Sequence, residues 1–347
     1  MTVAHVSPTY FGSDSLLGGA ERYVTDLAQA MARRTRTRLV TFGKKARRES
    51  WGPLEVHIHK PMGYARGIRF NPVSLSFLSS LWDVDVIHCY QPATLVTDLA
   101  IFQGWLSQKS VFATDLGGSA NFSLWYHLPL WKGLRSLLVI SDFNRARFSH
   151  LPLPAHVIYG GVDTVRFCPS SGKKGRRFLH VGRLLPHKGI HHLLEAHPPG
   201  IGLDVVGPVC GLVYERQLRK QAQGKDIAFY AQIPDNELIL KYQTAVATVL
   251  PALEDSGFTT VLESFACGTP VIVYSTGSLP EIVEEGLTDF LVAPGNLDAL
   301  REKMNLLAAQ PSIRETMGRH ARKVSMDRFT WDTVVERCLQ AYRSPSR

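Results

Sequence analysis

The chain has 347 residues, which is long for one domain and comfortable for two domains of about 150 to 200 residues each. Hydrophobic residues make up 45% and charged residues 20% of the sequence, a composition typical of a globular protein with enough apolar material for two cores. No stretch approaches the roughly 18 to 20 uncharged apolar residues that span a bilayer, so we expect no membrane-spanning helix.

The N-terminus, MTVAHVSPTY, lacks a basic stretch followed by an apolar run, so we expect no signal peptide. Five cysteines lie far apart in the sequence: Cys89, Cys168, Cys210, Cys267 and Cys338. The absence of a CxxC pair argues against a disulfide framework or a cysteine metal site, and it favours a reducing, cytoplasmic location.

Short apolar segments alternate with amphipathic ones along the whole chain, as in parallel sheets with helical crossovers. In the first half we expect strands at residues 3–6, 38–42, 55–58, 86–88, 110–113 and 137–140. Residues 19–34, GAERYVTDLAQAMARR, have apolar residues at helical spacing and basic residues at their C-terminal end, which predicts a helix.

Residues 163–177, DTVRFCPSSGKKGRR, have the Pro, Ser, Gly and charge content of a linker. A second strand series is expected at residues 177–181, 203–206, 227–230, 246–250, 270–273 and 290–292. The two series predict two successive doubly wound α/β halves, in which ligands bind at the carboxyl ends of the strands.

The net charge is +9, and a basic run without any acid lies between residues 33 and 48: Arg33, Arg34, Arg36, Arg38, Lys44, Lys45, Arg47 and Arg48. This run is either a solvated helix end and loop, or it attracts an anionic membrane or an acidic substrate. The run matches no nucleic-acid recognition motif, so we expect no nucleic acid as a partner. Residues 121–138, NFSLWYHLPLWKGLRSLL, combine aromatic residues with cations, which fits a membrane interface and a buried helix equally.

Residues 7–24, SPTYFGSDSLLGGAERYV, predict a strand, a glycine-containing loop and a helix that begins near Gly18 and Gly19. Glycines let backbone N–H groups approach a ligand closely, and a helix N-terminus favours anions. The segment therefore either contacts phosphate or merely forms a tight turn.

Residues 178–196, FLHVGRLLPHKGIHHLLEA, place Arg183 just after a strand and Lys188 just before a helix. A planar guanidinium and a mobile ammonium, together with the helix N–H groups, are suited to grip a diphosphate, whereas two solvent-exposed cations are the alternative. The histidines of this segment have no carboxylate or cysteine at ligand spacing nearby, so we expect no metal here.

Residues 253–271, LEDSGFTTVLESFACGTPV, place Asp255 in a loop and Glu263 about one turn inside a helix that begins at Thr259. A carboxylate at Glu263 can accept two hydrogen bonds from a vicinal diol. Asp255 could contact a second polyol ring or a developing positive charge. A helix cap and a surface salt bridge would explain the two acids without any ligand.

Together these segments resemble the retaining glycosyltransferases of the GT-B fold, in particular glycosyltransferase family 4. The resemblance covers nearly the whole chain and is densest from residue 157 to 295. VIYGGVDTVRF is similar to the family's NGVD…F segment, VGRLLPHKG to its GRL…KG segment, and residues 227–296 to its longest signature. GGAERYVTDLAQAMA resembles its N-terminal glycine loop and helix.

The resemblance implies two doubly wound Rossmann-like domains that face each other across a cleft. Residues 1–165, with a crossing helix at about 327–347, would form the acceptor side, and residues 166–326 the nucleotide-sugar side. The implied reaction moves a sugar from a nucleotide-diphosphate donor to a glycan or lipid-linked acceptor, with retention of anomeric configuration. No metal or other cofactor is implied, because the cations and the helix N-terminus take the charge of the leaving diphosphate.

The same resemblance assigns roles to individual residues. Arg183 and Lys188 would hold the diphosphate, Glu263 the ribose hydroxyls, and Asp255 the transferred sugar. Backbone amides would meet the sugar and phosphates at Gly18, Gly19, Gly257, Phe258 and Thr259.

The sequence departs from the family pattern at several positions. Asp255 stands where relatives usually have Glu, and Gly160 where they usually have Asn. Thr114 and Asp115 occupy the place where many relatives carry a His, so Asp115 either replaces that contact to the sugar or the role is lost. His88 is an alternative, although a buried strand-end histidine is the simpler interpretation.

Other functions on the same fold are a sugar-nucleotide-binding protein with little turnover, an epimerase or a phosphorylase. The absence of a cofactor-lysine signature argues against a phosphorylase, and the ordered pair of acids argues against an epimerase. The base of the nucleotide, the sugar, the acceptor and the oligomeric state do not follow from these patterns.

Overall fold

The computed structural model describes residues 1–10, 19–68, 71–116, 123–124, 128–170, 172, 175–254 and 258–344. The chain divides into two compact units: unit one is Met1–Gly161 with Trp331–Arg347, and unit two is Val162–Thr330. The sequence placed these boundaries after residues 165 and 326, so the two divisions differ by four residues at each point.

Unit one is built on an eight-stranded sheet with the order β10-β9-β8-β7-β1-β2-β4-β3. Every neighbouring pair is parallel except β3 with β4. The strands are β1 (Thr2–Tyr10), β2 (Arg36–Phe42), β3 (Arg47–Trp51), β4 (Leu54–His59), β7 (Val86–Tyr90), β8 (Ser110–Asp115), β9 (Ser136–Val139) and β10 (Ala155–Val157). A separate antiparallel pair joins β5 (Gly63–Tyr64) to β6 (Pro72–Val73).

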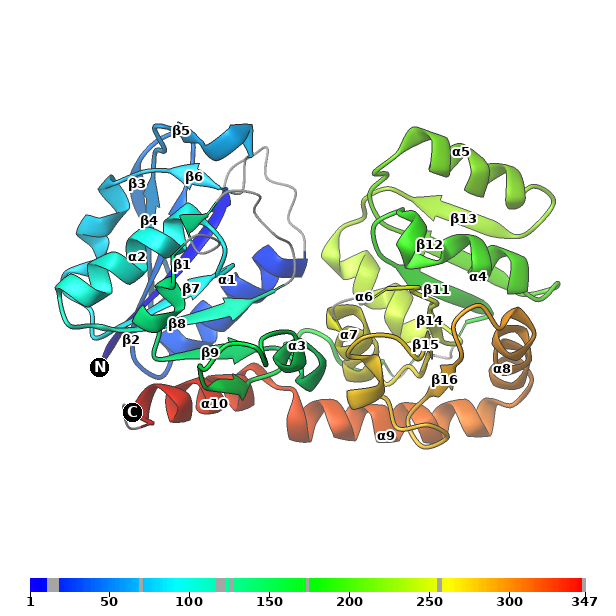
Figure 1. Ribbon diagram of the computed structural model, residues 1–347. Helices are drawn as coiled ribbons and strands as arrows, with labels where there is room; N and C mark the ends of the chain where they lie inside the picture. Colours follow the sequence, from blue (N-terminus) through cyan, green and yellow to red (C-terminus); the bar gives the residue numbers. More distant parts are fainter. Residues whose placement is uncertain are drawn as a thin grey trace. The chain divides into compact units, whose positions relative to one another are not determined.

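Helices cover both faces of this sheet (Figure 1). The α-helices are α1 (Gly19–Ala32), α2 (Leu95–Leu106), α3 (Asp142–Arg147) and α10 (Trp331–Arg343), and short 3₁₀ turns are η1 (Ala65–Gly67), η2 (Ser76–Leu81) and η4 (Leu130–Gly133). Helix α10 comes from the far end of the sequence and packs on α1, while α2 and η2 pack on the apolar cluster of the opposite face.

Unit two has a six-stranded, wholly parallel sheet with the order β13-β12-β11-β14-β15-β16. Its strands are β11 (Arg177–Val181), β12 (Gly202–Val206), β13 (Ile227–Tyr230), β14 (Thr248–Leu250), β15 (Val271–Tyr274) and β16 (Phe290–Val292). Its helices are α4 (Ile190–Ala196), α5 (Leu212–Gln221), α6 (Asp235–Thr244), α7 (Thr259–Ala266), α8 (Leu297–Ala309) and α9 (Pro311–Arg328), with η5 (Pro186–Lys188) and η6 (Leu279–Glu281).

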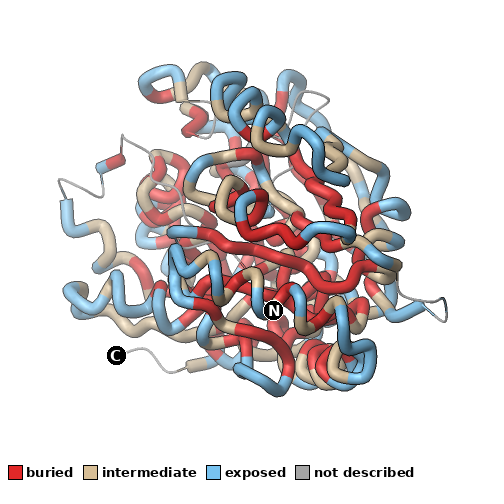
Figure 2. The backbone as a smooth tube through the Cα atoms, turned by 90° about the vertical axis from the view of Figure 1, so that its right-hand side faces the viewer, coloured by how far each residue is buried: buried red, intermediate tan, exposed pale blue. Residues whose placement is uncertain are grey.

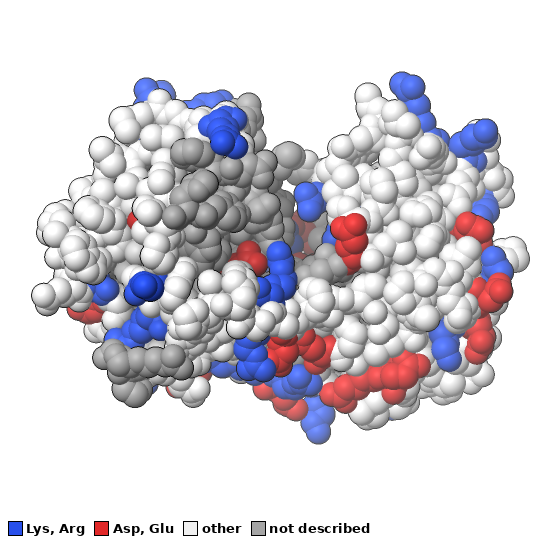
Figure 3. All heavy atoms as spheres, in the orientation of Figure 1, with Lys and Arg blue, Asp and Glu red and all other residues white. Residues whose placement is uncertain are grey.

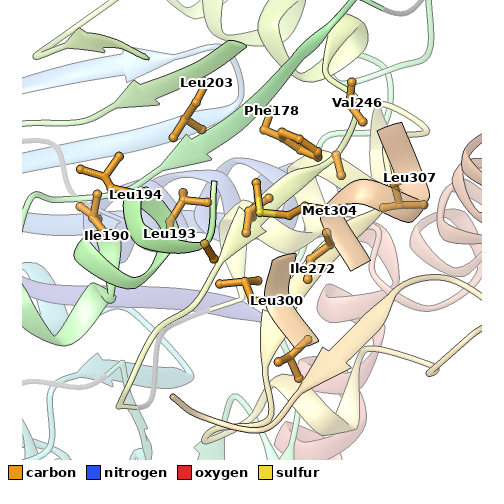
Figure 4. Close-up of a cluster of buried hydrophobic side chains, with 14 of the residues drawn as sticks. Phe178, Ile190, Leu193, Leu194, Leu203, Val246, Ile272, Leu300, Met304 and Leu307 are labelled. Atoms are coloured by element: carbon orange, nitrogen blue, oxygen red, sulfur yellow. The ribbon is translucent and has the colours of Figure 1, made fainter. Parts of the chain in front are cut away.

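Apolar side chains from the sheet and from α4, α5 and α8 form the core on one face of unit two (Figure 4). Phe178 on β11, Leu193 on α4 and Leu300 on α8 are all completely buried. Burial of one such side chain contributes roughly 1.5 to 3 kcal/mol, so this cluster fixes the helices that precede and follow the carboxyl edge of the sheet. Figure 2 shows runs of buried residues along the strands and exposed residues along the outer helices.

The two doubly wound α/β halves predicted from the sequence are confirmed. All twelve expected strands are present, with ends shifted by a few residues, and the helix expected at residues 19–34 spans 19–32. Strands β3, β5, β6 and β10 were not predicted, because they are short or polar and carry little apolar periodicity.

Candidate functional site

Three loops meet at the carboxyl edge of the unit-two sheet, after β11, β14 and β15. The backbone N–H of Leu253, after β14, donates to the carbonyl oxygen of His187, after β11, at 2.8 Å. The hydroxyl of Thr276, after β15, donates to the carbonyl oxygen of Ala252 at 3.0 Å. These bonds hold the loops together at the edge where open α/β sheets bind ligands.

Gly189 brings the loop after β11 against the loop after β14. Its φ is +66°, and a Cβ atom at this position would lie 1.8 Å from the carbonyl oxygen of Pro251. Glycine alone fits both the left-handed backbone and the close approach. Lys188, the preceding residue, is therefore held next to the loop that leads to α7.

Arg183 and Lys188 both lie in the loop after β11. Arg183 is exposed, whereas Lys188 is half-buried. His187 lies between them in the sequence, and its pKa is lowered by burial and then by the charge of Lys188. The Glu254 carboxylate raises this pKa, and Arg183 lowers it further. Two cations and one carboxylate thus act on a single imidazole, which leaves this edge of the sheet with an excess of positive charge.

Glu263 lies one turn inside α7 and is buried, with 4% of its surface exposed. Its Oε2 accepts a hydrogen bond of 2.8 Å from the hydroxyl of Tyr242 on α6. Burial, and then the neighbouring Glu263 carboxylate, raise the pKa of Tyr242 well above its ordinary value, so the phenol stays a donor. The carboxylate is therefore held in one orientation by the neighbouring helix.

The N-terminus of α7 lies in the same loop cluster. Its N-cap residue, Phe258, is buried and supplies no side-chain hydrogen bond to the helix. Thr259 opens the helix and is half-buried. The N–H groups of a first turn carry partial positive charge and bind anions, which adds to the charge of Arg183 and Lys188.

Sequence reasoning did not single out His180, although a polar residue inside the apolar strand FLHV was a signal. His180 is 1% exposed, and its Nδ1–H donates to the carbonyl oxygen of Val249 at 2.9 Å. Its Nε2 has no hydrogen-bond partner among the described residues and lies 3.4 Å from the place that a Cβ of Gly182 would occupy. Burial lowers the pKa of His180 to about 4, so the ring is neutral at neutral pH.

Asp115 belongs to unit one, where it ends β8. Its side chain is buried, and Oδ2 lies 3.8 Å from Nη1 of the more exposed Arg147. His88, the alternative to Asp115, is completely buried: Nε2 shares a hydrogen bond with Thr114 Oγ1 and Nδ1 one with Tyr342 Oη, both at 2.7 Å. Both ring nitrogens are therefore occupied within the core, as expected for a buried strand-end histidine.

Several predicted site residues cannot be placed. Asp255, Gly257 and Gly18 lie outside the described residues, and Gly19 is the exposed first residue of α1. Arg183, Lys188, Phe258, Thr259 and Glu263 all belong to unit two, in the loop after β11 and in the segment that opens α7.

The histidines that follow Lys188 are bonded to tyrosines. His191 Nδ1 is 2.9 Å from Tyr214 Oη, and His192 Nδ1 is 3.1 Å from Tyr274 Oη. In the part of the chain that the structure describes, no group of three His, Cys, Asp or Glu side chains is close enough to hold a metal ion.

Two doubly wound α/β units, the second with a cationic loop and a helix N-terminus at its carboxyl edge, define the GT-B class of protein. Two family models match the chain: "Glycosyl transferases group 1" over residues 163–324 and "Glycosyltransferase Family 4" over residues 17–166. The chain therefore carries a family 4 glycosyltransferase domain followed by a group 1 glycosyl transferase domain.

Curated relatives are similar in sequence. The glycogen synthase of Mycobacterium tuberculosis (strain CDC 1551 / Oshkosh) is 29% identical over 204 residues, covering 55% of this chain and 49% of the relative. The D-inositol 3-phosphate glycosyltransferase of Acidothermus cellulolyticus is 26% identical over 294 residues, covering 76% and 63%. The chain thus spans about half to two thirds of the length of these relatives.

Solved structures share the fold over nearly the whole chain. The sucrose-phosphate synthase of Thermosynechococcus elongatus has a TM-score of 0.77 at 19% identity and covers 99% of this chain and 98% of its own. HepE of Anabaena, solved in complex with UDP, has a TM-score of 0.75 at 19% identity, with coverages of 98% and 99%.

Proposed function

We propose that the chain transfers a hexosyl group from a nucleotide-diphosphate sugar to a glycan or lipid-linked acceptor, with retention of anomeric configuration. The observation that carries the proposal is the loop cluster of unit two, where the loop of Arg183 and Lys188 is hydrogen-bonded to the loop that leads to α7, the helix of the buried Glu263. HepE, which shares the fold, was solved with UDP-glucose. That ligand class is the one that cations and a diol-binding carboxylate would recognise.

Each group has a role in this proposal. Arg183 and Lys188 would neutralise the diphosphate in the ground state and the additional charge that develops on it as the glycosidic bond breaks. The first-turn N–H groups of α7, whose N-cap is Phe258 and whose first residue is Thr259, would bind the same oxygens. Because these donors compensate the leaving-group charge, we propose that no metal or other cofactor takes part.

Glu263 would accept hydrogen bonds from the two ribose hydroxyls, since a carboxylate that Tyr242 holds in place keeps lone pairs for a vicinal diol. Asp255, whose role rests on the family resemblance, would contact the transferred sugar. Gly18, Gly19 and Gly257 would contribute backbone contacts, and Asp115 would contact the sugar near the reacting carbon. The five free cysteines support a reducing, cytoplasmic location.

A thermal-shift panel with UDP, GDP and ADP and their hexose conjugates, without added metal, tests the donor site. A ligand at about 100 times its dissociation constant adds about 2.7 kcal/mol of stability, which gives a readable shift. We expect one nucleotide to respond, and the response to disappear in Arg183→Ala and Glu263→Gln. The matched control is Arg219→Ala, an exposed arginine of α5 that bonds to Glu215 on its own helix and lies over the ring of Phe229.

The outcomes separate the candidate functions. A response that persists equally in both site variants would refute the donor-site assignment. Turnover of the responding conjugate with an acceptor, lost in Asp255→Asn, would support transfer. Binding without any turnover across acceptors would favour a sugar-nucleotide-binding protein, and reaction without an acceptor would favour an epimerase.

We further propose that any peripheral contact with an anionic membrane uses the exposed end of α2. Most of the basic run is paired within unit one; its ion-paired members are Arg33, Arg34, Arg36, Arg38 and Arg47. On the face shown in Figure 3 cations are scattered among acids and uncharged residues. Phe102, Trp105 and Leu106 are 59%, 71% and 59% exposed at the end of α2.

Co-sedimentation with vesicles tests this contact. We expect binding to phosphatidylglycerol vesicles to fall in Trp105→Ser and to persist in Leu212→Ser, which removes an equally exposed side chain from unit two. Equal sedimentation of the two variants would contradict the assignment. Among the described helices, none combines the length and the apolar character needed to cross a membrane.

A further inference from the structure

A polar cavity of about 600 Å³ lies in unit one at the edge of the sheet where β2 and β4 begin. The proposed donor site lies in unit two, so the cavity is separate from it. The cavity also lies at the amino ends of β2 and β4, whereas the donor site lies at the carboxyl ends of its strands. Six of its lining residues carry the argument: Arg36, Arg38, Arg48, His57, Ser80 and Trp82.

The floor of the cavity is one face of three adjacent strands. In the sheet, Arg38 of β2 lies opposite Glu55 of β4, and His57 of β4 lies opposite Arg48 of β3. Because side chains alternate between faces along a strand, these four residues share one face. Segment η2 and the residues after it cover this face, since Ser80 accepts from Arg38 through its carbonyl oxygen at 2.8 Å.

The guanidinium of Arg38 is bonded to residues of the protein and holds the cavity wall in place. The Arg38 side chain is 7% exposed, and its guanidinium donates to both carboxylate oxygens of Asp83, at 2.6 and 3.1 Å, and to Glu55 at 3.2 and 3.3 Å. Arg36 shares the same Glu55, through its other oxygen, at 3.3 Å. The buried arginine therefore fixes both acids of the cavity in place.

Arg48 is the cation that these acids do not compensate. Across the residues that the structure describes, it takes part in neither a hydrogen bond nor an ion pair, and its side chain is exposed. The remaining acid, Glu49, accepts from Arg47 and Trp51, which alternate with Arg48 along β3 and so lie on the opposite face. Three guanidinium groups and three carboxylates line the cavity, but Glu49 is paired with Arg47, so Arg48 remains the guanidinium without an ion-pair partner among the described residues.

His57 adds a hydrogen-bond donor to the cavity, and the hydroxyl groups around it determine which ring nitrogen carries the hydrogen. Ser80 Oγ lies 2.8 Å from His57 Nδ1 and 3.0 Å from His59 Nε2, and His59 Nδ1 lies 3.2 Å from Ser76 Oγ. If the Ser80 hydroxyl donates to His57, the second nitrogen of His57, Nε2, carries the hydrogen. That nitrogen is the one left for a ligand in the cavity.

We propose that this cavity binds a small phosphate monoester, held by Arg48 and Arg36 and by the neutral Nε2–H of His57. The unpaired guanidinium of Arg48 selects a compact dianion over a neutral sugar. Trp82, which is 59% exposed on the rim, covers the organic part of the ligand.

Isothermal titration calorimetry of the full chain with ribose 5-phosphate tests the proposal, with neutral ribose as the comparison ligand. We expect the affinity for ribose 5-phosphate to fall at least tenfold in Arg48→Gln. The matched control is Arg33→Gln, which removes the same charge from an arginine of unit one that does not line the cavity. Arg183→Ala should leave the affinity unchanged, because that residue belongs to the proposed donor site.

A second measurement reports directly on His57. The resonance of its Nε2–H proton should shift downfield when ribose 5-phosphate accepts this hydrogen bond, and the shift should be absent in Arg48→Gln. The proposal is overturned if Arg48→Gln and Arg33→Gln weaken binding equally, if Arg183→Ala abolishes it, if ribose binds as tightly as its phosphate, or if no binding occurs at millimolar ligand.

Discussion

The hydroxyl of Tyr242 holds the buried carboxylate of Glu263, so its removal leaves a buried charged group one hydrogen bond short. Such a loss costs about 1 to 3 kcal/mol. We expect Tyr242→Phe to lower the free energy of unfolding of unit two by this amount and to weaken nucleotide binding, measured by urea unfolding followed by circular dichroism. Tyr230→Phe, which alters a half-buried phenol of the same unit, should change stability by less than about 0.5 kcal/mol.

The left-handed backbone of Gly189 provides a second residue-scale prediction. Alanine here would strain φ and also place Cβ 1.8 Å from the carbonyl oxygen of Pro251. We expect Gly189→Ala to cost on the order of 3 kcal/mol or more and to displace the loop that carries Lys188.

Gly200 offers a matched comparison for Gly189. It has a φ of +78°, but no atom lies within 4 Å of the place that a Cβ would occupy, so Gly200→Ala should cost only about 1 to 2 kcal/mol of backbone strain. Thermal unfolding of the two variants separates strain from steric overlap. Equal losses would mean that the contact with Pro251 does not restrain the loop.

At the scale of elements, helix α10 is fixed to unit one by buried contacts at both ends. Trp331 packs so closely on Gly161 that a Cβ there would lie 2.5 Å from the indole, and Tyr342 shares a 2.7 Å hydrogen bond with the buried His88. The pairs of Arg33 and Arg34 with acids of α10 are solvent-exposed, and such pairs contribute little.

We therefore expect Tyr342→Phe to destabilise unit one by about 1 to 3 kcal/mol, because it leaves the buried His88 Nδ1 without a partner. Arg33→Gln should change stability by less than about 1 kcal/mol, although it removes a full charge. Urea unfolding monitored by tryptophan fluorescence measures both. A larger loss for Arg33→Gln than for Tyr342→Phe would contradict this account of how α10 is held.

The elements that the sequence predicted are those with a buried apolar face. Strand β3, RRESW, was missed because it is an antiparallel edge strand whose hydrogen bonds to β4, rather than apolar burial, define it. At the site, residue type and spacing singled out Arg183 and Glu263. The bond that orients Glu263 could not be predicted, since it depends on how α6 packs beside α7, which no local pattern encodes.

At the scale of the whole molecule, both units bury neutral histidines. Burial lowers the pKa of His5 in unit one to about 3 and that of His180 in unit two to about 4. Unfolding returns each imidazole to about 6.5, so the unfolded state binds more protons below that pH. The stability that these residues contribute is complete above pH 6.5 and is lost as the pH falls toward about 4 for His180 and about 3 for His5.

Each unit should therefore become less stable between pH 6.5 and pH 4, and the two losses can be read separately. All six tryptophans belong to unit one, so tryptophan fluorescence follows that unit, whereas circular dichroism follows both. A shift of about 2.5 pKa units at His180 corresponds to about 3 kcal/mol. We expect His180→Phe to remove most of that loss from the dichroism transition and to leave the fluorescence transition unchanged. A fluorescence transition that moved with it would show that the units unfold together, and an unchanged acid sensitivity in both would exclude His180 as a cause.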